Sequence, residues 1–224
     1  MCMKMPCSDI KNLTDIFSST IDEIKPLLVK KMVDKYLEKH ELSETITREF
    51  LENFYTRLLE VSFGQGEKAL ALLLRYLSED AAYIFDWDGT LTAFKYAIGS
   101  LLPCRDDEVE EYCKTHNLYI DVYVLKTMQF IISFLPADRV YILTRSELTV
   151  IADKNTAINN NFNNIKPDHI IHVQNAGNKL AKLRKIHEET GLNLFFTEDT
   201  FKTILDAEEC LEYVQGISIT EVIS

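Results

Sequence analysis

From residue 81 onward, the chain alternates short apolar runs with amphipathic segments, and this rhythm limits the possible folds more than any other feature. The runs are rich in residues that favour buried strands, and the segments between them have helical periodicity. Such alternation is typical of a parallel α/β sheet flanked by helices. We expect strands at 82–85, 140–143, 169–173, 194–196 and 216–219, and helices at 122–135, 148–160, 179–190 and 201–213.

The first 80 residues have a helical pattern instead. Thr20 and Glu23 have the spacing of a capping box, and apolar residues then recur every three or four positions. A second helical segment follows Ser43, and a third follows a Gly-Gln-Gly break. The GQGEK sequence at this break lacks the spacing of a phosphate loop and follows no strand, so we interpret it as a turn between helices. The sequence thus predicts an N-terminal helical region over 1–80 and an α/β core over 81–224.

Composition narrows the functional class. The 224 residues are 46% apolar, enough for one full globular domain and a smaller helical piece. A net charge of -11 argues against general nucleic-acid binding, despite a small basic cluster at Lys179, Lys182, Arg184 and Lys185. The longest wholly apolar run, 69–74, is far shorter than the roughly 20 residues of a transmembrane helix.

Five scattered cysteines have no metal-site spacing, which indicates free thiols in a reducing compartment. We therefore expect a soluble, cytoplasmic protein, and the sequence leaves export to another cell open.

Two aspartates stand directly after the first expected strand, in the sequence Tyr-Ile-Phe-Asp-Trp-Asp-Gly-Thr-Leu-Thr. Asp86 and Asp88 are two residues apart, so both carboxylates can face one site at a strand end. Paired carboxylates suit a hard cation such as Mg²⁺, which also offsets their mutual repulsion. The simpler alternative is an ordinary turn, since Asp and Gly are common turn residues. Trp87, which lies between the two aspartates, should point away from the site into the core.

The DWDGTLT sequence resembles the first motif of the haloacid dehalogenase (HAD) superfamily of phosphatases. Three further motifs of that family have matches here in the family's order. Thr144 ends a strand and is followed by Arg145, and Lys179 stands near the start of a helix, with Lys182 as a fallback. Glu198 and Asp199 end another strand. Ligand sites of open parallel sheets lie at these strand ends. The resemblance covers about residues 81–219 and implies a Rossmann-like fold.

The resemblance also implies a mechanism. Asp86 would attack phosphorus to form an aspartyl-phosphate, and Asp88 would act as acid and then as base. Mg²⁺ would be held by Asp86, Asp199 and the backbone carbonyl of Asp88. Thr144, Arg145 and Lys179 would bind the phosphoryl group. An acid at position 88 favours a phosphatase over the dehalogenases and transport ATPases of the superfamily.

Two departures from the family pattern concern the outer parts of the site. Thr203 stands where many relatives carry a further aspartate, and Asp206 lies almost a turn later, so the sequence leaves open whether Asp206 or Glu198 assists the metal. The Lys-Pro dipeptide seen near the lysine of many relatives is absent as well. Neither departure affects the expected nucleophile.

The stretch between Thr92 and Val122 has room for a small flap but not for a large cap, so we expect an open site for a phosphoprotein, with phosphotyrosine as one candidate. Phe94 and Tyr96 could stack on such a ring or belong to the core, and the acidic stretch 106–111 could be a rim or a solvated helix face. Two alternatives remain open: a small-metabolite phosphatase in which the N-terminal helices close the site, and an interaction protein with a vestigial phosphatase core.

Overall fold

The computed structural model describes residues 24–43, 46–61, 66–92, 115, 120, 122–175 and 177–220. The chain divides into two compact units, Met1–Gly64 and Gln65–Ser224. The expected flap region, with Phe94, Tyr96 and the acidic stretch 106–111, lies outside the described residues, as do Thr20 and Glu23 of the expected capping box. Among the described residues, no helix is both long and apolar enough to cross a membrane.

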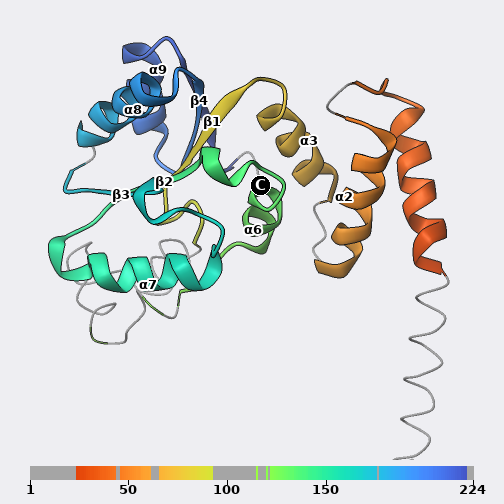
Figure 1. Ribbon diagram of the computed structural model, residues 1–224, viewed down its shortest axis with the longest axis horizontal. Helices are drawn as coiled ribbons and strands as arrows, with labels where there is room; N and C mark the ends of the chain where they lie inside the picture. Colours follow the sequence, from red (N-terminus) through yellow and green to blue (C-terminus); the bar gives the residue numbers. More distant parts are fainter. Residues whose placement is uncertain are drawn as a thin grey trace, which may run out of the picture. The chain divides into compact units, whose positions relative to one another are not determined.

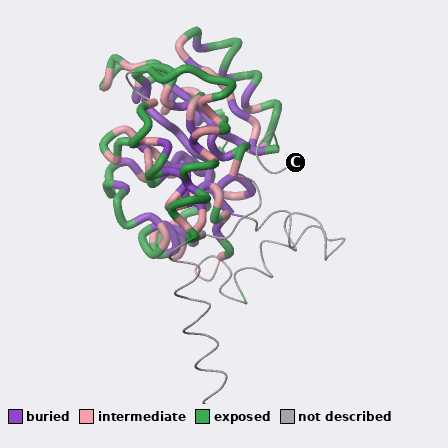
Figure 2. The backbone as a smooth tube through the Cα atoms, turned by 90° about the vertical axis from the view of Figure 1, so that its right-hand side faces the viewer, coloured by how far each residue is buried: buried purple, intermediate pink, exposed green. Residues whose placement is uncertain are grey.

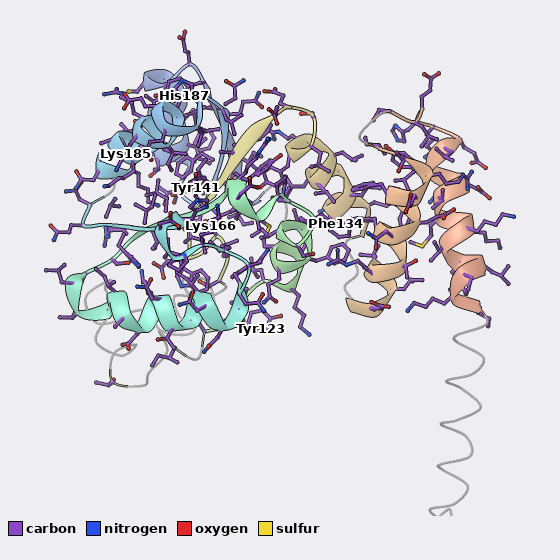
Figure 3. The ribbon with its side chains drawn as sticks, in the orientation of Figure 1. Tyr123, Phe134, Tyr141, Lys166, Lys185 and His187 are labelled. Carbon is purple, nitrogen blue, oxygen red and sulfur yellow. The ribbon has the colours of Figure 1, made fainter. Side chains whose placement is uncertain are left out.

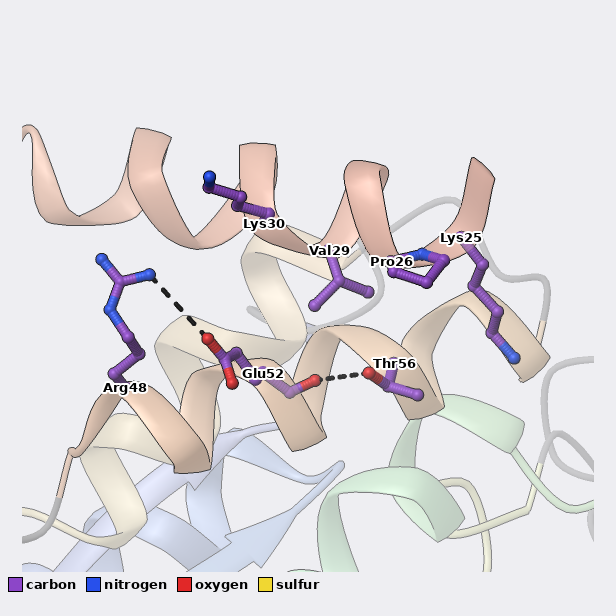
Figure 4. A pocket seen from close by; sticks show the side chains of 7 residues that line it. All are labelled: Lys25, Pro26, Val29, Lys30, Arg48, Glu52 and Thr56. Atoms are coloured by element: carbon purple, nitrogen blue, oxygen red, sulfur yellow. Dashed lines mark hydrogen bonds and ion pairs between the residues drawn. The ribbon is translucent and has the colours of Figure 1, made fainter. Parts of the chain in front are cut away.

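The first unit contains a helix over residues 24–37 and α2 (Arg48–Val61). Thr47 caps α2, because its hydroxyl accepts the backbone N–H of Phe50 at 3.1 Å. Leu51, Phe54 and Leu58 are buried along α2, at the spacing that makes one face of a helix. Figure 4 shows a pocket whose walls come from both helices; it is lined by Lys25, Pro26, Val29, Lys30, Arg48, Glu52 and Thr56.

The second unit is built on a five-stranded, all-parallel sheet in the order β3-β2-β1-β4-β5 (Figure 1). Its strands are β1 (Ala81–Phe85), β2 (Val140–Arg145), β3 (Ile170–Val173), β4 (Asn193–Glu198) and β5 (Val214–Ser218). Its helices are α3 (Gly66–Tyr76), α6 (Lys126–Ile132), α7 (Ile151–Asn161), α8 (Gly177–Thr190) and α9 (Phe201–Cys210). Short 3-10 turns occupy Ala137–Arg139, Leu148–Val150 and Pro167–His169. The predicted α/β, Rossmann-like fold class is therefore confirmed.

The two faces of the sheet are covered by different side chains. On one face, Ala82 and Ile84 of β1 join a buried cluster that includes Leu183 of α8 and Ala207 of α9. On the other face, the ring of Tyr76 at the end of α3 packs edge-on against Tyr83, Phe85 and Phe195. In Figure 2 the buried segments are purple, and β1 is buried along its whole length. A strand buried on both faces explains the unbroken apolar run in the sequence.

The position of Tyr76 also corrects the expected division at residue 80. The boundary between the units falls at Gly64 and Gln65, so α3 belongs with the sheet and not with the N-terminal helices. Tyr76 donates to, or accepts from, the Thr197 hydroxyl at 2.6 Å, which ties α3 to β4 in addition to the aromatic contacts.

The sheet order places a change of direction between β1 and β4. The chain moves from β1 outward to β2 and β3, then returns through α8 to pair β4 with the opposite side of β1. The connections after β1 and β4 therefore lead to strands on opposite sides of this pair, and open parallel sheets bind their ligands at the carboxyl ends of strands where such a reversal occurs.

Candidate functional site

Asp86 is the first residue beyond β1, and it is held at the edge of the sheet by its backbone. Its N–H donates to the carbonyl of Thr197 at 2.9 Å, which extends the pairing of β1 with β4 by one step. The side chain is only 6% exposed. The expected nucleophile is thus fixed by the sheet itself rather than by a mobile loop.

The turn after Asp86 reverses the chain within a few residues. The carbonyl of Trp87 accepts the backbone N–H groups of Leu91 and Thr92, each at 3.1 Å, and the Thr92 hydroxyl at the same distance. Gly89 has a φ of 81°, which a residue with a side chain rarely adopts. Trp87 is buried and packs edge-on against Phe162, so its expected orientation toward the core is confirmed.

Three carboxylates converge beside this turn. Ligand oxygens of Asp86, Glu198 and Asp199 lie within 4.8 Å of one another. The register explains the meeting, because Phe85 pairs with Thr197 and the next residues along both strands are therefore neighbours. Asp86 and Glu198 are buried, whereas Asp199 is partly exposed at the mouth of the cluster.

Lys179 reaches this cluster from α8. Its Nζ lies 2.6 Å from Asp86 Oδ1 and 2.6 Å from Glu198 Oε2, and all three side chains are buried. Burial alone would lower the pKa of Lys179, but the charges of Asp86 and Glu198 outweigh it and raise that pKa. The lysine is therefore a fixed positive charge at the site. Lys182, the fallback choice, lies one turn later and is half-buried.

The cluster holds more negative than positive charge. Burial, followed by the charge of Asp86, raises the pKa of Glu198 to about 8. Burial also raises the pKa of Asp86, although Lys179 opposes the shift. A divalent cation would relieve this imbalance, and converging carboxylate oxygens are the ligands that Mg²⁺ accepts. Asp86, Glu198 and Asp199 thus fit a magnesium site.

Asp88 belongs to a second group of contacts, at the end of β2. Its Oδ2 accepts a hydrogen bond from Lys154 Nζ and lies 3.4 Å from the Thr144 hydroxyl. Thr144 is fully buried, and Arg145, the next residue, is exposed. The predicted pair Asp88 and Thr144 is therefore brought together, and both lie at the strand ends where the site was expected.

Of the two residues that the sequence offered as helpers of the metal, only one lies at the site. Asp206 is exposed on α9 and is not part of the carboxylate cluster found among the described residues, whereas Glu198 is. Sequence reasoning overlooked Lys154, which is buried on α7. The spacing of the sequence could have identified it. Lys154 stands three residues before the buried Ala157 and four before the buried Ile158, on the apolar face of its helix. A lysine on such a stripe is almost always paired.

The pocket of the first unit shares no residue with the predicted motifs, and two of its cations, Lys25 and Arg48, are paired with carboxylates. Lys25 pairs with Glu60 at 2.9 Å, and Arg48 pairs with Asp34 at 3.2 Å. Cys210, the cysteine among the described residues, is a free thiol.

The chain matches no protein-family model, and no curated protein is significantly similar to it.

Proposed function

We propose that this protein is a Mg²⁺-dependent phosphatase that hydrolyses a phosphate monoester through an aspartyl-phosphate on Asp86. The observation that carries the proposal is the convergence of Asp86, Glu198 and Asp199 within 4.8 Å, with Lys179 bound to two of them. This convergence joins residues from three separate motifs of the HAD-like pattern at one sheet edge. An incidental turn at Asp86 would not require these partners.

Four residues of the site have distinct roles in the proposed reaction. The Asp86 carboxylate attacks phosphorus, while Asp88 gives its proton to the departing oxygen. In the second step Asp88 takes a proton from water, which then hydrolyses the phosphoaspartate. Lys179 and Thr144 stabilise the oxygens of the transferring group. A bound Mg²⁺ would supply further charge stabilisation for these oxygens.

For the substrate we propose a phosphoprotein, with phosphotyrosine as the first class to test. In relatives of this kind a large cap can be inserted between the motifs containing Thr144 and Lys179. Here that interval is occupied by α7 and β3, with short connections. The absence of room for a large cap there favours an open site, which a protein substrate can approach.

The test is a turnover assay with Mg²⁺ on para-nitrophenyl phosphate, a phosphotyrosine peptide, a phosphoserine peptide and a panel of phosphorylated metabolites. We expect turnover that Asp86→Asn and a chelator both abolish, with a peptide preferred over the metabolites. A preference for one metabolite would support a small-molecule phosphatase instead. Inactivity on every substrate, with Mg²⁺ shown to bind, would leave an interaction protein with a vestigial core as the better description.

A further inference from the structure

Lys154 is buried beside the candidate site but belongs to none of the four motifs, so the proposed mechanism gives it no role. Its side chain projects from α7, and the residue is only 3% exposed. The Nζ atom donates to Asp88 Oδ2 and to the backbone carbonyl of Arg145 at 2.7 Å, and it lies 3.5 Å from the Thr144 hydroxyl. All three acceptors belong to the segments that end β1 and β2. Lys154 thus binds the expected acid-base residue and, at the same time, the end of the neighbouring strand β2.

The burial of this lysine has an electrostatic cost, because its ammonium group loses most of its hydration. The carbonyl of Arg145 and the carboxylate of Asp88 compensate for this loss. The three donor hydrogens of an ammonium can serve these acceptors at the same time. Asp88 is itself partly exposed, with 29% of its side chain accessible, so a substrate can reach it while its Oδ2 is bound to Lys154.

A network next to Lys154 fixes the helix that carries it. Asn155 follows Lys154 on α7, and its Oδ1 lies 2.8 Å from His172 Nε2. His172 Nδ1 lies 2.8 Å from the hydroxyl of Ser146, whose backbone N–H donates to Val173 at 2.8 Å. These distances fit a neutral histidine that donates through Nε2 and accepts the Ser146 hydroxyl at Nδ1. The network ties α7 to the ends of β2 and β3, and so fixes the base of the Lys154 side chain.

We propose that Lys154 is a positioning residue that orients the Asp88 carboxyl group for proton transfer to the leaving oxygen. This inference rests on the phosphatase function proposed above. By donating to Oδ2, Lys154 leaves Oδ1 to carry the proton that passes to the leaving oxygen as its bond to phosphorus breaks. Lys154 itself neither gains nor loses a proton. Because it acts through Asp88, its importance should depend on how much help the leaving group needs.

The test compares two substrates of nearly equal size in the full-length protein with Mg²⁺. Phenyl phosphate has a basic leaving group that needs a proton, whereas para-nitrophenyl phosphate releases a stable anion without one. We expect Lys154→Met to lower kcat/KM for phenyl phosphate by about 10- to 100-fold, since general acids contribute roughly that much or more. The kcat/KM for para-nitrophenyl phosphate should fall far less. The comparison uses kcat/KM because this constant reports phosphoryl transfer to Asp86 and not the later hydrolysis of the intermediate, which both substrates share. The ratio of the two rates comes from one preparation, so partial unfolding cancels.

Four further variants sharpen the test. Lys185→Met removes an exposed lysine of α8, labelled in Figure 3 and paired with Glu189 at 3.4 Å, and should leave the ratio unchanged. Asp88→Asn should change the ratio in the same direction as Lys154→Met. Adding Lys154→Met to Asp88→Asn should change it no further, because both act on one step. Lys154→Gln replaces Lys154→Met should the latter fail to fold.

An equal loss on both substrates, or no loss on either, would overturn the inference. Equal loss would mean that Lys154 binds the phosphoryl group directly. Additive effects in the double variant would also contradict a role through Asp88. If the wild-type protein hydrolyses neither substrate nor any phosphorylated compound, the proposed function itself fails, and this outcome is distinct from an unchanged ratio in an active enzyme.

Discussion

At the scale of single residues, the candidate site is governed by three carboxylates, two of which are paired with Lys179. Glu198 holds a proton in the folded protein at pH values where it would be ionised in the unfolded chain, since its pKa rises from 4.5 to about 8. The folded state therefore binds more protons than the unfolded state across this interval. By linkage, the contribution of Glu198 to the stability of the metal-free protein falls as pH rises from 4.5 to about 8.

Magnesium should reverse this trend, because the cation competes with the proton for the same oxygens. We expect Mg²⁺ to raise the Tm more at about pH 8 than at about pH 6, and Glu198→Gln to reduce both the pH slope and the response to Mg²⁺. Part of the slope should persist in the variant, because the pKa of Asp86 is raised as well. Thermal unfolding with and without Mg²⁺ measures both effects. A response to Mg²⁺ that is equal in the wild type and Glu198→Gln would exclude Glu198 from the metal site.

The sequence could predict Asp86, Lys179 and Asp199 because each follows a recognisable local pattern at a strand or helix end. It could not predict that Lys154 would meet Asp88. That contact depends on how far α7 extends over the end of β2, which is a property of the tertiary structure. The burial of Glu198 was equally hidden, because it follows from the register between β1 and β4.

At the scale of elements, α7 is joined to the sheet through His172. Burial lowers the pKa of His172 below 6.5, with the charge of Lys154 acting in the same direction and that of Asp88 opposing it. The unfolded chain therefore takes up a proton at a pH where the folded protein does not. The contribution of His172 to stability is present above 6.5 and is lost as pH falls from there toward the folded-state pKa.

We expect the Tm of His172→Gln to gain more, or lose less, than that of the wild type when the pH falls from about 7 to about 5. Glutamine does not titrate in this range, whereas Glu198 affects both proteins alike. The exposed residue Asp168 offers a control, since Asp168→Asn leaves the network intact. The same change of Tm over this range in the wild type and in His172→Gln would contradict the described network.

Close packing joins α9 to β5 at Gly216. A Cβ atom there would lie 2.1 Å from Ile204 Cγ2, so Gly216→Ala should lower the free energy of unfolding by about 1–3 kcal/mol. Ile204→Ala removes the clashing group, and the double variant should therefore lose less than the sum of the two single variants. Gly177→Ala is the control, because its Cβ would meet its nearest neighbour at an ordinary 3.5 Å. Chemical denaturation provides the free energies; additive losses would contradict the packing.

Most elements were predictable from periodicity, but their ends were set by tertiary contacts. The helix expected over 201–213 ends at Cys210, because the carbonyl of Tyr213 already accepts the N–H of Leu194 at 2.8 Å. The helix expected over 122–135 is shortened to Lys126–Ile132, since Val124 forms a bridge with Thr92. No local sequence pattern in either segment predicts these contacts of Tyr213 and Val124, because both partners lie far away in the sequence.

At the scale of the whole molecule, the second unit contains every residue of the candidate site. It also contains the complete sheet and the helix α3, which the sequence had assigned to the N-terminal region. Periodicity showed that α3 was a helix but could not show that Tyr76 packs against β1 and β4. Whether the second unit folds and acts without the first can therefore be tested by producing it alone.

We expect residues 65–224 to unfold cooperatively and to retain most of the activity on para-nitrophenyl phosphate, because no site residue lies in the removed part. The comparison requires the full chain, measured under the same conditions by circular dichroism and by initial rates. Loss of small-substrate activity in a well-folded fragment would favour the alternative in which the N-terminal helices close over the site.

The most direct test of the central claim is to trap the phosphorylated aspartate. Asp88→Asn should still transfer phosphate from para-nitrophenyl phosphate, whose leaving group needs no acid, but should hydrolyse the intermediate slowly. The reaction is quenched in acid, reduced with borohydride and mapped by mass spectrometry. The account predicts homoserine in place of Asp86, dependent on Mg²⁺ and absent in Asp86→Asn. Reduction at another residue, or turnover by the wild type with no product at Asp86, would contradict it.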